Sequence, residues 1–201
     1  YTFGGYYTER NGEGTLYYSE SGAGVLPAYS VDNDLTLYAN WTANRYTVEY
    51  NPNKPSGASS QVQGETVFSS HTYDEEKQLT ASGFTLTGWT FMGWATESGG
   101  GVVYESSASV SNLTDEADGR ITLYAVWAAN TYTVSYNANE PSGSSSEVSG
   151  STTSSFHSYD TSKALTTNGF TLTGWTFMGW NTQADGNGTS YENGATVLNL
   201  T

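Results

Sequence analysis

One block of sequence occurs twice in this chain without a single change. The sequence GFTLTGWTFMGW fills residues 83–94 and returns at residues 169–180, a spacing of 86 residues. The flanks keep this spacing, because the YTV of residues 46–48 returns at residues 132–134. Self-similarity at a fixed period is the signature of a repeat protein. We therefore expect tandem copies of one small folded unit.

A third, partial copy opens the chain. Residues 2–6 (TFGGY) match residues 90–94 (TFMGW), and residues 37–41 (LYANW) match residues 123–127 (LYAVW). Three segments are predicted: the C-terminal half of a repeat at 1–41, a complete repeat at 42–128, and a repeat lacking its closing strand at 129–201. The sequence is expected to be a window cut from a longer array, and strand donation between chains is the alternative.

The apolar residues of a repeat recur with a period of two, which is typical of β-strands. Tyr46, Val48 and Tyr50 alternate with polar neighbours, and glycine-rich turns separate the runs. Residues 89–94 carry apolar side chains on both faces, Trp89 and Phe91 on one and Met92 and Trp94 on the other, which predicts a strand covered on both sides. The expected core is Tyr46, Trp89, Phe91 and Trp127, with the equivalents Tyr132, Trp175 and Phe177.

One short helix is expected in each repeat, so the predicted fold class is mainly β (α+β). Asp74 and Asp160 suit the N-cap position. Each is followed by a polar run that ends in a leucine, residues 75–79 and 161–165. Lys77 and Lys163 would then complement the dipole of that helix.

Composition excludes several classes of function. The chain has 20 acidic and 6 basic residues, a formal charge of −14, so nucleic acid is not an expected partner. No apolar run approaches the roughly 20 residues of a membrane span, so direct membrane insertion is not expected. The chain has no Cys, which excludes disulfides, thiolate metal sites and cysteine nucleophiles.

At three motifs the sequence resembles the internalin-B B-repeat family, also called the Listeria–Bacteroides repeat. They are the opening YTV at 46–48, the central GWTFMGW at 88–94 and the closing LYAVW at 123–127. The resemblance implies tandem small β-grasp-like domains with a short helix against a mixed sheet, found in bacterial cell-surface proteins as stalks or adhesion modules. It implies no catalytic residues. The Ser/Gly-rich stretch at 56–70 makes this repeat longer than the family's shortest form.

Candidate metal ligands are few. His71 and His157 are equivalent residues without neighbouring ligands of the same kind, so we expect them to be structural. Residues 185–188 (DGNG) suggest a calcium loop, but the equivalent residues 98–101 (SGGG) lack the carboxylate and the amide. No metal and no cofactor are therefore expected.

Candidate catalytic groups vary between copies. Glu49 becomes Ser135, and the two glutamates at 75–76 become Thr161 and Ser162. Asp115 and Glu116 lie in a loop that the last copy lacks. Because a catalytic site needs one preorganised set of groups, we expect no enzyme activity.

Two functions remain open for an extracellular segment on a bacterial cell surface. The first is a non-catalytic stalk or spacer, whose partners are neighbouring repeats of the same longer chain. The second is a multivalent carbohydrate- or host-ligand-binding adhesin, in which repeated rings stack on a surface glycan or contact a protein ligand. The candidate rings are Tyr17, Tyr104 and Tyr191, and the set Tyr6, Trp94 and Trp180.

The linkers predict an elongated row of domains. Residues 42–45 and 128–131 join apparent strands and contain neither Gly nor Pro, so they leave little freedom between copies. We expect small-angle X-ray scattering to show an extended particle with one repeated orientation between domains. A compact globule, or a broad mixture of bent forms, would contradict this expectation.

Overall fold

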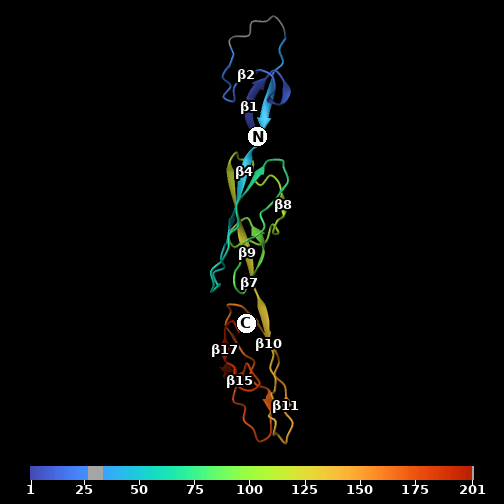
Figure 1. Cartoon of the computed structure of the whole chain (residues 1–201), viewed down its shortest axis with the longest axis vertical. Helices are drawn as coiled ribbons and strands as arrows, with labels where there is room; N and C mark the ends of the chain where they lie inside the picture. Colours follow the sequence, from blue (N-terminus) through green and yellow to red (C-terminus); the bar gives the residue numbers. More distant parts are fainter. Residues whose placement is uncertain (27–33, 201) are drawn as a thin grey trace. The chain divides into compact units, whose positions relative to one another are not determined.

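The computed structural model describes residues 1–26 and 34–200, which consist mainly of short strands and loops (Figure 1). The expectation of a mainly β fold is confirmed. The strands are β1 Thr2–Tyr7, β2 Leu16–Tyr18, β3 Tyr38–Thr42, β4 Arg45–Asn51, β5 Ser69–Thr72, β6 Lys77–Gln78, β7 Trp89–Ala95, β8 Ser109–Val110, β9 Gly119–Ala129, β10 Thr131–Val134, β11 Ser149–Gly150, β12 Ser155–Ser158, β13 Lys163–Ala164, β14 Phe170–Thr171, β15 Trp180–Asn181, β16 Ser190–Tyr191 and β17 Thr196–Val197.

The chain divides into two compact units. The first contains residues 1–53, 64–84 and 92–126, and the second contains residues 54–63, 85–91 and 127–201. The first unit holds a three-stranded antiparallel sheet in the order β2-β1-β3 and the pair β6-β8. The second holds four strand pairs, β10-β12, β11-β14, β13-β17 and β15-β16. The segment boundaries after residues 41 and 128 stay a prediction.

A four-stranded sheet has the order β5-β4-β9-β7, so that β4 lies between two other strands. β4 pairs antiparallel with β5, with Tyr46 opposite His71. On its other edge β4 pairs parallel with β9, with Tyr46 opposite Gly119. Because β4 has a partner on both edges, its inward side chains are enclosed, and Tyr46 and Val48 are 1% and 0% exposed.

The equivalent strand of the second unit is less enclosed. β10 pairs with β12 in the same register, with Tyr132 opposite His157. Among the described residues β10 has no strand on its other edge. Tyr132 is accordingly half-buried where Tyr46 is fully buried.

The expected core is confirmed only in part. Tyr46 is buried, whereas Trp89, Phe91 and Trp127 are half-buried. Trp175 and Phe177 are 54% and 38% exposed, so the prediction was wrong for them. The largest fully buried side chains are Trp94, Tyr46, Leu123, His71, His157 and Val48.

A glycine in β7 explains why the side chains of this strand do not follow the alternation that a period of two predicts. Met92 is 51% exposed while Trp94 is 0% exposed, although both were assigned to one covered face. Gly93 between them has φ +145°, and a Cβ at Gly93 would lie 2.7 Å from Tyr104 O. The backbone is therefore irregular at Gly93, and this turns Trp94 into the core. Gly179 shares this conformation, with φ +140°.

The expected helices are absent from the described residues, which contain one short 3-10 helix, η1 Arg10–Gly12. Asp74 and Asp160 have φ values of 64° and 57°, a left-handed conformation, whereas an N-cap residue is extended. The chain therefore turns there and enters β6 or β13, which pair with β8 and β17. Lys77 and Lys163 donate to Ser70 O and Phe156 O instead of facing a helix end.

The β-grasp expectation is not supported by the described residues. It required a short helix against a mixed sheet in each repeat. The described part of the complete repeat has the mixed sheet, with one parallel pair between β4 and β9, but no helix packs on it.

None of the helices in the described ranges is long and apolar enough to cross a membrane.

Trp94→Ala is expected to lower the free energy of unfolding of the first unit by about 3–5 kcal/mol, because it removes a fully buried ring from a packed core. Trp180→Ala is the matched control, because Trp180 occupies the equivalent position but is half-buried. Its effect should be smaller. Denaturant unfolding of both variants measures the difference, and an equal loss for the two would contradict it.

Candidate functional site

The same polar contact occurs once in each unit, where one copy of the repeat meets the next. In the first unit Thr2 Oγ1 donates to Asn44 Oδ1 at 2.8 Å. In the second unit Thr90 Oγ1 donates to Asn130 Oδ1 at 2.6 Å. The two asparagines belong to the short linkers, and the two threonines are equivalent in the sequence alignment. A contact repeated this way is a property of the repeat.

An aspartate accepts a second contact beside each asparagine. Tyr1 OH donates to Asp74 Oδ2 at 2.8 Å in the first unit. Trp89 Nε1 donates to Asp160 Oδ2 at 3.0 Å in the second. Tyr1 and Trp89 each precede the threonine of the first contact. The ring type therefore changes between copies, but the polar hydrogen that reaches the aspartate is retained.

Each aspartate is also held by an asparagine of its own repeat. Asp74 N donates to Asn112 Oδ1 at 2.6 Å, and Asn112 Nδ2 donates back to Asp74 Oδ1 at 2.8 Å. Asp160 and Asn199 make the same pair of bonds, at 2.6 and 2.8 Å. This reciprocal pair needs the left-handed backbone of the aspartate, which aspartate tolerates better than most residues.

Ser59 adds two further bonds to Asp160. Its backbone N and its Oγ donate to the carboxylate at 3.0 and 2.6 Å. Donors that stabilise the charged form lower the pKa of a carboxyl. The Ser59 hydroxyl, then Trp89 and Asn199, hold the pKa of Asp160 well below its usual range. Asn112, then Tyr1, lower the pKa of Asp74. Both groups therefore act as ionised acceptors rather than as proton donors.

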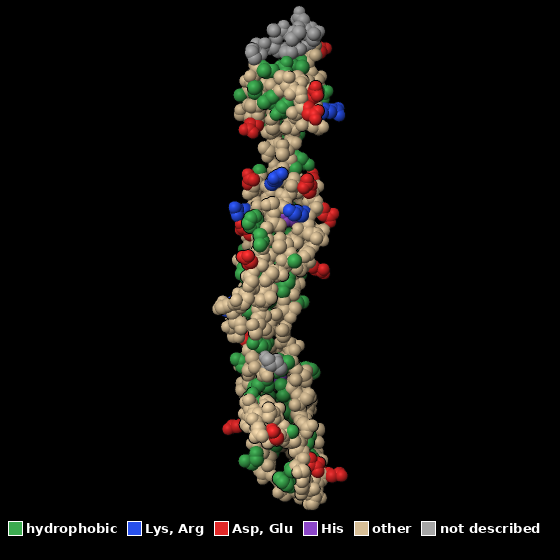
Figure 2. Space-filling model, in the orientation of Figure 1, with side chains coloured by type: hydrophobic (Ala, Val, Ile, Leu, Met, Phe, Trp, Pro, Cys, Tyr) green, Lys and Arg blue, Asp and Glu red, His purple; other side chains and the backbone are tan. Residues whose placement is uncertain are grey.

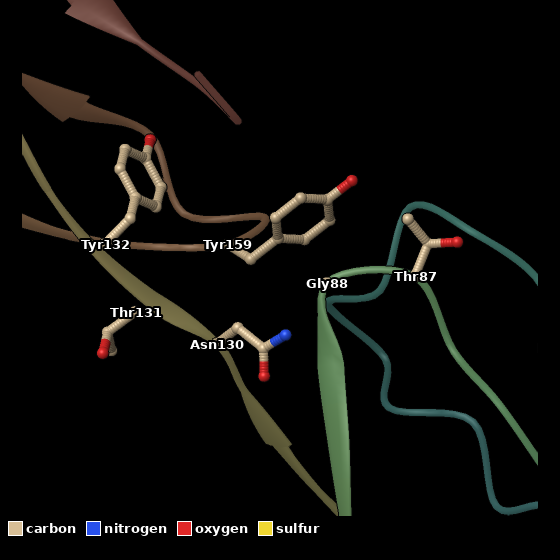
Figure 3. A pocket seen from close by; sticks show the side chains of 6 residues that line it. All are labelled: Thr87, Gly88, Asn130, Thr131, Tyr132 and Tyr159. Carbon is tan, nitrogen blue, oxygen red and sulfur yellow. The ribbon is translucent and has the colours of Figure 1, made fainter. Parts of the chain in front are cut away.

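A pocket of about 280 Å³ opens beside this contact in the second unit (Figure 3). Its lining residues are Thr87, Gly88, Asn130, Thr131, Tyr132 and Tyr159. In Figure 3 the Tyr159 side chain extends toward the backbone at Gly88. Gly88 has φ +74°, and a Cβ at this position would overlap the Tyr159 ring. The close approach of ring to backbone therefore requires glycine.

The two histidines belong to a buried hydrogen-bonded network that also recurs. His71 Nε2 lies 2.8 Å from Ser69 Oγ, which lies 2.9 Å from Tyr50 OH. The corresponding distances are 2.8 Å for His157 and Ser155, and 2.9 Å for Ser155 and Tyr136. The rings of Tyr46 and Tyr132 stack on the two histidines, each with centroids 5.3 Å apart.

A Ser–His pair at this distance has the geometry of a nucleophile and its base, but its surroundings differ from those of a catalytic pair. His71 and His157 are 2% and 1% exposed, and no Asp or Glu orients either ring, since Nδ1 of each has no hydrogen-bond partner among the described residues. A catalytic triad places a carboxylate there. The network instead satisfies polar groups between β-strands.

The candidate metal ligands do not converge in the described parts of the chain. No three His, Cys, Asp or Glu side chains there gather at one point. The loop at 185–188 closes on itself, because the Asp185 carboxylate accepts from Asn187 N and Nδ2, each at 3.0 Å. The Asn187 backbone, then its side chain, lower the pKa of Asp185.

The repeated rings that the adhesin hypothesis needs lie at different depths. Tyr6 is 41% exposed, Trp180 is half-buried and Trp94 is 0% exposed, although the three are equivalent. Tyr17, Tyr104 and Tyr191 are all half-buried. These sets therefore do not present one stacking surface that recurs from copy to copy.

Sequence reasoning missed the junction residues. Asp74 and Asp160 were assigned to helix caps, and Asn44, Asn130 and Ser59 were given no role. A signal was present, because the asparagine and the aspartate recur at the repeat spacing of 86 residues. Nothing in the sequence showed that they face a threonine and a ring from a distant segment.

The chain belongs to the Listeria–Bacteroides repeat family, whose domain model matches it twice, at residues 46–126 and 132–201. It is also similar to a protein of Evansella cellulosilytica named "Putative Gly-rich membrane protein". The two are 29% identical over 141 residues, which is 69% of this chain and 15% of that relative. The chain thus spans a small part of the relative's length. No solved structure matches the chain.

Burial makes the stability of the fold depend on pH through the two histidines. Burial, then a nearby lysine, lowers the pKa of His71 and of His157 below 6.5. Between pH 6.5 and the lowered pKa values of the folded chain, the unfolded chain therefore binds more protons than the folded chain. The stability contributed by neutral histidine is complete above pH 6.5 and declines as the pH falls below it.

We expect the thermal unfolding midpoint to fall between pH 7 and about pH 5. Gln at both positions is the control, because its amide does not titrate there, and the decline should be shallower in His71→Gln/His157→Gln. Calorimetry across this range measures both proteins. Parallel curves for the two would show that the histidines do not cause the decline.

Proposed function

We propose that the chain is a non-catalytic spacer segment of a bacterial cell-surface protein, which holds another domain away from the surface. The observation that carries this proposal is what the repeated residues do. Residues kept between copies, such as His71 and His157, or Asp74 and Asp160, make core and junction contacts. Most carboxylates outside these contacts change from copy to copy, as Glu49 becomes Ser135 and Glu75 becomes Thr161, whereas Glu105 is retained as Glu192.

The surface chemistry suits a spacer. Figure 2 shows acidic side chains scattered over the visible face, with hydrophobic ones interspersed among uncharged polar groups. The whole chain has 20 acidic residues and 6 basic ones. Such a surface stays soluble and repels anionic polymers and lipids.

The family and the relative support the location. The chain belongs to a repeat family, and the relative is named a membrane protein of which this stretch matches 15%. A short matched stretch within a long protein is what a spacer array attached to other domains would produce. We therefore place the chain outside the cell, as part of a longer surface protein.

A length-matched exchange in the natural protein tests the spacer role. One variant lacks residues 46–131, one repeat length, and a second carries an unrelated folded domain of equal length in their place. A spacer acts through length, so deletion should reduce antibody access to the presented domain on intact cells, and exchange should preserve it. Equal loss of access in both variants would contradict the proposal.

An adhesin that binds carbohydrate is the second candidate, and the pocket in Figure 3 favours it. Two tyrosine rings, an amide and hydroxyl groups line it, which are the groups that stack on and hydrogen-bond to sugars. Glycan-array binding of the chain, compared with Tyr159→Ala, distinguishes the two. Binding that this variant abolishes would replace the spacer proposal, and no binding by either protein would retain it.

A further inference from the structure

We propose that each copy of the repeat carries a receptor that binds the preceding copy and fixes the orientation between them. The receptor is an asparagine–aspartate pair, Asn44 with Asp74 and Asn130 with Asp160. Its partner is an aromatic–threonine pair, Tyr1 with Thr2 and Trp89 with Thr90. We call the assembled contact the clasp. This proposal extends the proposed spacer function and rests on it, because a fixed orientation between copies makes a spacer rigid.

The asparagine ties the linker to both neighbouring copies. Asn44 is 9% exposed, and its side-chain oxygen, side-chain nitrogen and backbone oxygen each have a partner. Its Oδ1 accepts from Thr2, its Nδ2 donates to Asp115 O at 2.6 Å, and its backbone O accepts from Tyr73 N at 2.9 Å. A buried side chain satisfied on several sides has one low-energy position, so it restricts the linker.

The second unit repeats part of this arrangement with a different ring, around an asparagine that is exposed rather than buried. Asn130 O accepts from Tyr159 N at 2.8 Å, and Asn130 Oδ1 accepts from Thr90. Asn130 N also donates to Gly88 O at 2.9 Å. Bonds to the ionised Asp160 are charge-assisted and stronger than neutral ones. The clasp therefore joins the residues just before Thr90 to the linker and to the following turn.

Ser59 forms a third point of the clasp in the second unit. It belongs to the Ser/Gly-rich stretch that lengthens this repeat. Its two bonds to the Asp160 carboxylate connect residues 101 positions apart in the chain. The extra stretch thus supplies a contact to the next copy, which gives it a role.

The ring of the aromatic–threonine pair is more exposed in the last copy than in the complete repeat. Trp175 and Thr176 are equivalent to Trp89 and Thr90, and Trp175 is 54% exposed where Trp89 is half-buried. Gly174 has φ +81°, close to the +74° of Gly88, but a Cβ at Gly174 would lie in open space. The same sequence therefore holds its ring against an asparagine–aspartate pair in one copy, and within the described residues it does not do so in the other.

Distances between spin labels in the intact chain test the proposal. The chain has no Cys, so residues replaced by cysteine can be labelled specifically. Gln61 and Thr153 are exposed and lie in consecutive copies. We expect one narrow distance peak in the parent chain. The variant Ser59→Ala/Trp89→Phe/Thr90→Val removes the side-chain donors of the clasp while keeping a ring at residue 89, and it should lose the narrow peak.

Two further variants make the test specific. Ser145→Ala/Trp175→Phe/Thr176→Val makes the same changes one repeat later, where no asparagine–aspartate pair of the described residues is in contact, and should keep the narrow peak. Trp89→Tyr with Ser59 and Thr90 intact should also keep it, because Tyr1 supplies the same donor to Asp74. Circular dichroism shows whether each variant is folded.

A narrow distance peak that survives in the Ser59/Trp89/Thr90 variant would overturn the proposal. Loss of the narrow peak in the Ser145/Trp175/Thr176 control, to the same extent as in that variant, would also overturn it. If the first variant fails to fold, Gly88→Ala and Gly174→Ala decide instead. Both share the cost of a positive φ, but only Gly88→Ala adds the overlap with Tyr159. Loss of the peak in Gly88→Ala alone supports the clasp, and no difference between them overturns it. The spin-label distances test the clasp whatever the outcome of the cell-surface exchange experiment, which tests the spacer role.

Discussion

The parallel pairing of β4 with β9 determines which side chains of the repeat become buried. A strand with hydrogen-bonded neighbours on both edges has its side chains enclosed, and the ring of Tyr46 then becomes core. In the second unit β10 has β12 on one edge, and no strand pairs with the other edge within the described residues. The equivalent ring of Tyr132 is then half-buried. Equivalent motifs thus differ in burial, with β4 between two strands of its sheet and β10, within the described residues, at the edge of a strand pair.

Polar side chains contribute to the order of the repeat together with its rings. Each repeat buries a histidine that is hydrogen-bonded to a serine and stacked on a tyrosine. A carboxylate at each junction accepts from several donors. In a chain rich in Ser, Thr, Asn and Gly, such networks make up for a modest content of aliphatic side chains. They also specify one geometry, because each donor requires its acceptor in one place.

The period of two predicted the strands correctly where the backbone stays regular, as in β4. It failed at Gly93, where a positive φ turns Trp94 into the core and leaves Met92 exposed. The helix expected after Asp74 failed for a related reason. Aspartate is favoured both at helix N-caps and in left-handed turns, and the bonds to Asn112 select the turn. That asparagine is 38 residues away, beyond the reach of any local pattern.

By itself the sequence determined that the chain is a tandem repeat, that its elements are mainly strands, and that it belongs to the Listeria–Bacteroides repeat family. These properties follow from the spacing of the repeats, the period of the apolar residues and the identity between copies, none of which requires knowledge of distant contacts. The tertiary structure alone decided which rings are core and which residues join one copy to the next. Burial and hydrogen bonding depend on segments brought together from far apart, such as Trp89 with Asp160, and no spacing along the chain encodes that pairing.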